Sequence, residues 1–257
     1  MTATRVDWIL RPLVWFTTAS IVNVVLHEWS HALTAHAFGK SATMFQYWVN
    51  WDWPSATAAQ RAAVGAAGPA FSLALGLLCL AAYTRLDFSA AGLPLLFLST
   101  IGLAIFFGNL MSTAFVGDFS NAAIVLELPR FMRFAASAAG AIAGAAVLFW
   151  QGRELRRSVP HDLGRVAGAL GAVGVPVAVG TTLIVAINQP TPADVPFASA
   201  RIAEASFEIF ALLGAMTVRP IAARDVGSSE LTWIDVAVLA AVVVPVRVMA
   251  QGIALAP

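Results

Sequence analysis

Long apolar segments separated by short polar connections run through the chain. A helix that crosses a bilayer needs about 20 mostly apolar residues. Segments that approach this length lie at roughly 12–38, 62–83, 93–117, 131–150, 166–187, 201–219 and 232–254. The segment 201–219 also contains Glu204 and Glu208, so it would equally suit a helix at the membrane surface. The pattern therefore predicts an all-α polytopic membrane protein with six or seven transmembrane helices.

One stretch between the first two apolar segments has a different period. Residues 39–60 are too polar to span a bilayer, yet they include Trp48, Trp51 and Trp53. Within 45–53, large apolar side chains alternate with mostly polar ones, and a period of two is typical of a β-strand. We expect a short membrane-associated β-hairpin or strand after the first helix. The alternative is an interfacial loop anchored by its aromatic rings.

The composition agrees with a membrane protein and excludes other classes. Of 257 residues, 59% are apolar and 11% are charged, whereas soluble domains carry about 25% charged residues. The mean hydropathy is +0.80. The net charge of +1 and the lack of a basic cluster argue against a nucleic-acid partner. The single cysteine, Cys79, has no partner in the chain for a disulfide.

The first apolar segment contains ionisable residues in a spacing that suits a metal site. His27 and His31 lie four residues apart, so on a helix they are separated by about 40° and both imidazoles reach one ion. Glu28 is offset by about 100° from His27 and is placed to act on a metal-bound water. This is the arrangement of the H-E-x-x-H pattern, in which two zinc ligands accompany a general base. Placing an ionisable side chain inside a membrane span costs free energy, so such a residue usually has a functional role.

A catalytic zinc site needs a third protein ligand. His36 fails on geometry, because it is turned by about 140° from His31 on a continuous helix. Asp118 is the best placed acidic residue, since it closes the third apolar segment beside Gly117, where the backbone can bend. The other acidic residues in or near apolar segments are Glu127, Glu204, Glu208 and Asp235.

Three stretches together resemble the site-2 protease family of intramembrane zinc metalloproteases. LHEWSHALTAHAFG, residues 26–39, is similar to the H-E-x-x-H helix of that family. AAGPAFSLALG, residues 66–76, resembles its Gly-Pro stretch, and NLMSTAFVGD, residues 109–118, resembles its Asn-Leu-x-Pro…Asp-Gly segment. The three occur in the family's order.

The resemblance implies roles for individual residues. His27, His31 and Asp118 would bind zinc, and Glu28 would be the catalytic base. Asn109 matches a family asparagine that binds the substrate backbone or the developing oxyanion. The resemblance also implies that the hairpin region binds an unwound substrate as an added strand.

In that hairpin, Val49 and Trp51 are the residues expected to contact the substrate. The chain also departs from the family pattern. Ser112 and Ala114 stand where the third motif has prolines, Phe119 replaces its final glycine, and no PDZ-like insertion is present. We expect a divergent, minimal member.

The expected function is zinc-dependent endoproteolysis of transmembrane protein substrates within the lipid bilayer. One alternative is another class of membrane metalloprotease, with Glu204 or Glu208 as the third ligand. The other is a metal-binding membrane protein without activity that sequesters membrane segments. The expected location is a prokaryotic cytoplasmic membrane, and the oligomeric state stays open.

Residues 1–130 would form the catalytic membrane core with the first three spans, and residues 131–257 would add further helices to the same domain. If all seven segments span, Lys and Arg residues are more numerous on the side of the N-terminus. The positive-inside rule then places the N-terminus in the cytoplasm. The family resemblance implies the opposite orientation.

Overall fold

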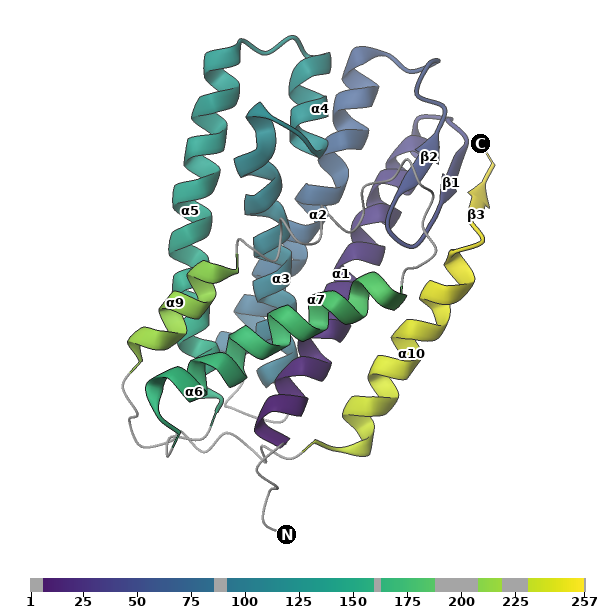
Figure 1. Ribbon diagram of the computed structural model, residues 1–257. Coiled ribbons are helices and arrows are strands. Elements are labelled where there is room, and N and C mark those ends of the chain that lie inside the picture. Colours follow the sequence, from purple (N-terminus) through teal and green to yellow (C-terminus); the bar gives the residue numbers. More distant parts are fainter. Residues whose placement is uncertain (1–6, 86–91, 160–162, 188–207, 219–230, 257) are drawn as a thin grey trace.

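The computed structural model describes residues 7–85, 92–159, 163–187, 208–218 and 231–256, which form a helical bundle with a small sheet at one end (Figure 1). The helices and strands are α1 (Asp7–Ala37), β1 (Ala42–Met44), β2 (Val49–Trp51), α2 (Ala58–Arg85), α3 (Gly92–Met111), η1 (Ser112–Ala114), α4 (Asp118–Val125), α5 (Arg130–Arg157), α6 (Arg165–Ala169), η2 (Leu170–Gly174), α7 (Val175–Ile187), α9 (Ile209–Thr217), α10 (Trp233–Met249) and β3 (Ile253–Leu255).

Five helical stretches are long and apolar enough to cross a membrane, as expected for an integral membrane protein. They are α1, α2, α3 with its 3-10 extension η1, α5, and the continuous run from α6 through α7. The helical polytopic class is thus confirmed. Among the described residues, five stretches meet this standard, whereas six or seven were expected.

The last two predicted spans differ from the expectation. Only 208–218 of the sixth segment lies within the described residues, and its helix α9 has 9 residues. The seventh segment was predicted to span to 254, which is wrong at its end. Helix α10 has 17 residues and stops at Met249. Gly252 then turns the chain at a φ of 83° and the next residues form β3.

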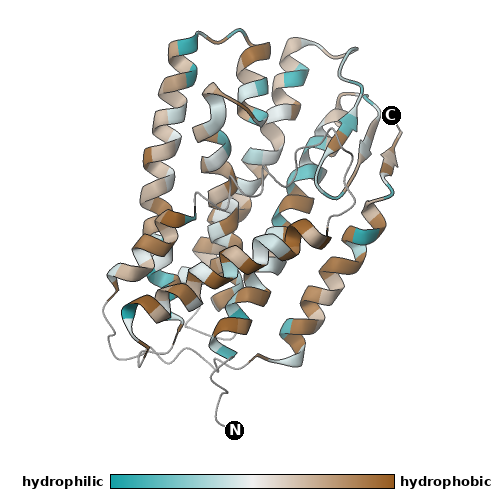
Figure 2. Ribbon diagram, in the orientation of Figure 1, coloured by the Kyte–Doolittle hydropathy of each residue, from teal (hydrophilic) through white to brown (hydrophobic). Residues whose placement is uncertain are grey.

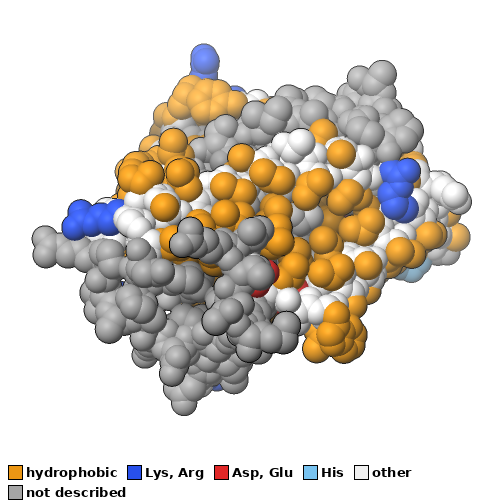
Figure 3. Space-filling model, turned by 60° about the horizontal axis from the view of Figure 1, so that its bottom comes forward, with side chains coloured by type: hydrophobic (Ala, Val, Ile, Leu, Met, Phe, Trp, Pro, Cys, Tyr) orange, Lys and Arg blue, Asp and Glu red, His pale blue; other side chains and the backbone are white. Residues whose placement is uncertain are grey.

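Helix α1 lies at the centre of the bundle. It packs against α2 and α3 on one side and against α7 and α10 on the other, and α7 crosses it obliquely (Figure 1). Hydrophobic residues run along most of the helices, whereas polar residues gather at helix ends and in the hairpin (Figure 2). Apolar side chains also cover much of one face, with Lys and Arg at its margins (Figure 3). Such a surface suits contact with lipid.

The predicted hairpin is confirmed, with a third strand that the sequence did not reveal. Strands β1 and β2 are antiparallel, with Thr43 opposite Asn50. Strand β3 pairs antiparallel with the other edge of β1, so the order is β2-β1-β3. The alternation at 45–53 is a strand only over β2. Phe45 and Trp48 instead form the connection, where their rings stack at 4.3 Å.

A buried cluster of polar side chains joins the start of α10 to α1. Asp235 accepts a hydrogen bond from Trp15 Nε1 at 2.7 Å, and its Oδ1 lies 3.7 Å from Arg11 Nε. Thr232 and Asp235 also form a capping box at the first turn of α10. Both charged side chains are at most 7% exposed. The ion pair between Arg11 and Asp235 therefore joins two helices that are far apart in the sequence.

Candidate metal centre

Helix α1 places both predicted histidines on one buried face. The His27 and His31 rings lie 4.8 Å apart, centroid to centroid, and both residues are 7% exposed. The four-residue spacing produces this arrangement because one helical turn separates the two side chains. The sequence prediction for this half of the site agrees with the geometry.

Asp118 reaches the histidines because the chain breaks before it. Helix α3 ends at Met111, the η1 turn follows, and Gly117 takes a φ of 99° before α4 begins at Asp118. A positive φ of this kind favours glycine. The side-chain oxygen of Asn109 accepts a hydrogen bond from the backbone N–H of Asp118 at 3.3 Å. The bend predicted beside Gly117 is therefore present.

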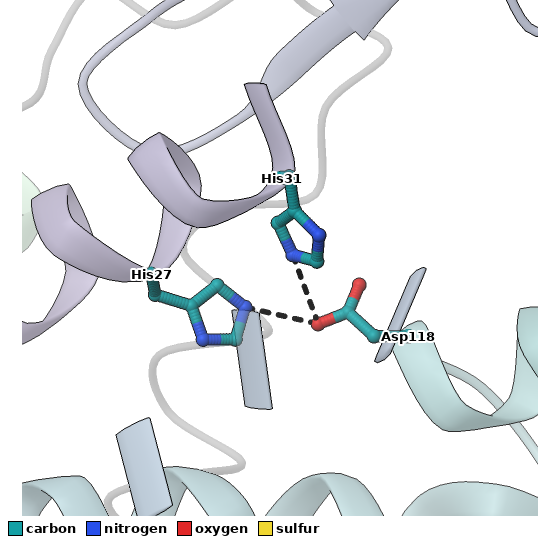
Figure 4. A group of neighbouring side chains, drawn as sticks. All are labelled: His27, His31 and Asp118. Atoms are coloured by element: carbon teal, nitrogen blue, oxygen red, sulfur yellow. Dashed lines mark hydrogen bonds and ion pairs between the residues drawn. The ribbon is translucent and has the colours of Figure 1, made fainter. Parts of the chain in front are cut away.

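The three side chains converge on one point (Figure 4). Oδ2 of Asp118 lies 3.0 Å from Nε2 of His27 and 3.6 Å from Nε2 of His31. Burial raises the pKa of the Asp118 carboxyl, but hydrogen bonds with both histidines outweigh that effect and hold this pKa well below its usual range. Asp118 is therefore an anion that faces two ring nitrogens.

The other nitrogen of each imidazole has its own partner. Nδ1 of His31 donates to the backbone carbonyl of Val64 at 2.5 Å, and Nδ1 of His27 lies 3.1 Å from Oγ of Ser72. Contacts of this kind fix the orientation of metal-binding histidines and leave Nε2 available for the ion. Both partners belong to α2, which thereby orients the two rings.

Gly68, also on α2, makes room for the imidazoles. A Cβ atom at this position would lie 2.4 Å from Nε2 of His31 and 2.5 Å from Nε2 of His27. No side chain larger than glycine fits without moving the rings. The Gly-Pro stretch of the sequence therefore has a steric role under the histidines.

The donor set fits a metal ion. Two imidazole nitrogens and one carboxylate oxygen lie within 4.8 Å of one another. A catalytic zinc typically has three protein ligands of these types and one open position. Within the described ranges, no other three His, Cys, Asp or Glu side chains form such a group. The structure thus contains a possible metal-binding triad whose ion is not identified.

Glu28 lies beside this triad on a cavity of about 310 Å³. The residues around this cavity come from α1, the hairpin and the segment after it, α2 and α4: Glu28, His31, Tyr47, Trp48, Val49, Trp51, Trp53, Val64, Gly65, Asp118 and Asn121. The predicted base and two of the predicted ligands therefore share one space. That space is bounded on its other side by the hairpin.

The remaining predicted residues fall into two groups. Val49 and Trp51 line the cavity, and their contact with a substrate stays a prediction. Asn109 does not line it, because its amide bonds the backbone of Ile105 and Asp118. Its role in substrate binding stays a prediction, and the structure shows it in a position that supports Asp118.

The alternative ligands lie elsewhere. His36 is exposed near the end of α1, and Asp235 belongs to the cluster with Arg11. Glu127 is exposed after α4, and Glu208 lies at the start of α9 outside the triad. Glu204 falls outside the described residues.

Sequence reasoning missed the residues that support the histidines. Ser72 and the Val64 carbonyl act through tertiary contacts, which no local pattern reveals. A weak signal existed in the spacing, because Gly68 and Ser72 are one helical turn apart and share a face of α2. Trp53 and Asn121 were also missed as cavity residues.

Comparison of the chain with protein-family models, curated proteins and solved structures gives no significant match. The interpretation of the site therefore depends on its own geometry.

Proposed function

We propose that the protein is a zinc-dependent intramembrane endopeptidase that hydrolyses peptide bonds of transmembrane proteins. The observation that carries this proposal is the shared cavity. His31, Asp118 and Glu28 all line it, and His27 belongs to the same triad as His31 and Asp118. A site that only held a metal would not require a further carboxylate beside the ligands.

In this proposal His27, His31 and Asp118 hold the ion. Bound zinc supplies a Lewis acid and lowers the pKa of water to near neutral. Glu28 accepts the proton of the attacking water and passes it to the leaving amine. Ser72 and Val64 keep the imidazoles oriented, so that the site is arranged before the substrate arrives.

The hairpin supports a peptide as the substrate. Strand β2 lies at one end of the sheet order, so its outer edge is not paired with another described strand. Val49 and Trp51 of this strand line the cavity. An extended peptide that adds to such an edge gains main-chain hydrogen bonds. A substrate helix must unwind first, because its carbonyl groups are already bonded within the helix.

The family assignment is part of the same proposal. The order and content of the three sequence stretches suggest a divergent relative of the site-2 proteases, working in a prokaryotic cytoplasmic membrane. The roles of Gly68 and Asp118 in the site support it, since they belong to the second and third stretches.

The test uses protein purified in detergent, with zinc measured by elemental analysis and cleavage followed on synthetic transmembrane peptides. The wild type should contain about one zinc ion per chain and cleave. Glu28→Gln should keep the zinc and lose cleavage by about a thousandfold or more, because it removes the proton acceptor. Undiminished cleavage by Glu28→Gln would rule out the proposed mechanism.

Glu127→Gln is the matched control. Glu127 is an exposed carboxylate after α4 and does not line the cavity. Its replacement should change neither zinc content nor cleavage. A wild type that holds zinc but cleaves no transmembrane peptide would favour the alternative of a silent metal-binding protein.

A further inference from the structure

Building on the proposed function, we propose that Trp51 and Trp53 form a subsite that selects a large apolar side chain beside the scissile bond. With this subsite, the enzyme would select among unwound membrane segments by the size of one substrate side chain next to the scissile bond. It names a substrate feature that the catalytic residues alone do not determine.

The two indoles form a wall of the cavity that holds Glu28. Their ring centroids lie 5.4 Å apart with planes at 68°, which is an edge-to-face arrangement. The guanidinium of Arg61 lies over the Trp53 ring, 5.2 Å from its centroid. The Trp53 ring therefore contacts both a second indole and a cation, and the wall exists before any ligand binds.

The strand geometry directs one substrate side chain to this wall. Side chains at alternate positions of a strand share a face, and Val49 and Trp51 of β2 follow this period and line the cavity. Trp53 lies just after the strand and also lines the cavity, with its ring beside that of Trp51. A peptide added to the edge of β2 also alternates its side chains. Every second one faces the same side as Trp51, and the one nearest Glu28 flanks the bond to be cut.

Charge disfavours a cationic side chain in this place. The acidic side chains that line the cavity are Glu28 and Asp118, and the proposed function assigns both, one as base and one as ligand. A divalent ion with these two carboxylates has no net charge, so a substrate cation would find no free counter-charge. Burying an unpaired charge is unfavourable. The wall is therefore suited to a neutral, large side chain.

The test measures binding and does not require turnover. Zinc-loaded Glu28→Gln protein in detergent micelles is titrated with fluorescent synthetic peptides of about 20 residues, a membrane-spanning length. The peptides carry Phe, Leu, Ala or Lys as a guest at successive central positions. At one position, Phe and Leu should bind about tenfold more tightly than Ala. Lys should bind no better than Ala.

Variants then assign that preference to the wall. Adding Trp53→Ala to Glu28→Gln should remove the tenfold preference, so that the Phe, Leu and Ala peptides bind with equal affinity. Trp53→Phe should retain most of it. Trp233→Ala is the control, because Trp233 is 78% exposed at the start of α10. Zinc content confirms that each variant is folded, and Trp53→Leu replaces Trp53→Ala if that variant loses zinc.

Equal affinity for all four guests, or a preference for Lys, would overturn the subsite and leave proteolysis standing. A preference that survives in Trp53→Ala would place the selection elsewhere and also overturn it. Failure of the zinc-loaded protein to bind any peptide would count against both the subsite and the proposed substrate class.

Discussion

Helix α1 carries two buried polar clusters that differ in how their charge is balanced. Near its start, Arg11 faces Asp235, so a cation meets an anion and both are at most 7% exposed. About 24 Å further along the helix, His27 and His31 face Asp118, whose side chain is 30% exposed on the cavity. The first cluster is closed and internally paired. The second borders the cavity, and its carboxylate faces two imidazole nitrogens in place of an Arg or Lys side chain.

The difference separates a structural role from a chemical one. Buried charges are tolerated when they are paired and hydrogen-bonded, and Asp235 satisfies this through Arg11, Trp15 and Thr232. The Asp118 cluster combines two imidazoles that could bind a metal with a carboxylate beside the cavity. His27, His31, Asp118 and Asp235 were all visible in the sequence as ionisable residues in or near apolar segments. Only their partners in the structure show which of them form a group that could bind an ion.

The largest effect should come from removing Asp118. Asp118→Ala deletes one of three ligands, so bound zinc should fall from about one ion per chain to nearly none. Elemental analysis of purified protein measures this directly. Glu204→Ala and Glu208→Ala should keep their zinc. The reverse result would move the third ligand to the segment 201–219.

Asp235→Ala should act on stability and leave the metal in place. It removes the carboxylate that pairs with the buried Arg11, and breaking a buried ion pair destabilises proteins by about 3–5 kcal/mol. Denaturant or thermal unfolding in detergent would show this loss, with zinc content unchanged at the working temperature. Combining Arg11→Met with Asp235→Leu should recover most of the free energy of unfolding. Zinc loss in folded Asp235→Ala protein would contradict the separation of the two clusters.

Gly68→Ala should weaken zinc binding by about a hundredfold, because the added methyl displaces two ligands that must stay in register. Competition with a chelator of known affinity measures the change. Gly108→Ala is the matched control on α3, since a Cβ there meets no atom within 4 Å. Equal zinc affinity in the two variants would show that the imidazole rings can move aside without weakening zinc binding, and would contradict the prediction.

Ser72→Ala should have the smallest effect, about tenfold in zinc affinity, because it frees one imidazole and leaves all three ligands in place. Ser99→Ala serves as the control. Ser99 is another fully buried serine, but it accepts a hydrogen bond from Gln151, away from the metal centre. A larger loss in Ser99→Ala than in Ser72→Ala would argue against the orienting role.

Local pattern predicted much of this molecule. Hydropathy located the cores of the long helices, and the spacing of His27 and His31 placed both rings on one face because a helix turn is regular. Alternation predicted strand structure after the first helix. Asp118 was found through its flanking glycine and the family resemblance, since no local rule links it to histidines some 90 residues away.

Features that depend on distant contacts were not predictable. Residues 253–255 are apolar, so hydropathy counted most of them with the preceding helix, and only pairing with β1 makes them a strand. Likewise, the Gly68 backbone and the Ser72 hydroxyl gain their meaning from the α1 side chains packed against them. Contacts between distant parts of the chain determine these features, and no short stretch of the sequence reveals those contacts.

The pairing of β3 with β1 has a consequence for how the protein is made. It joins residues 42–44 to residues 253–255, so the three-stranded sheet is incomplete until residue 255 has been synthesised. The three residues of the possible metal-binding triad, in contrast, are all present by residue 118. Contacts between such distant segments form late in folding because of the entropy of closing the loop. The third strand is therefore added after the β1–β2 hairpin and the residues of the triad have been made, so the last described segment of the chain closes onto one of the first.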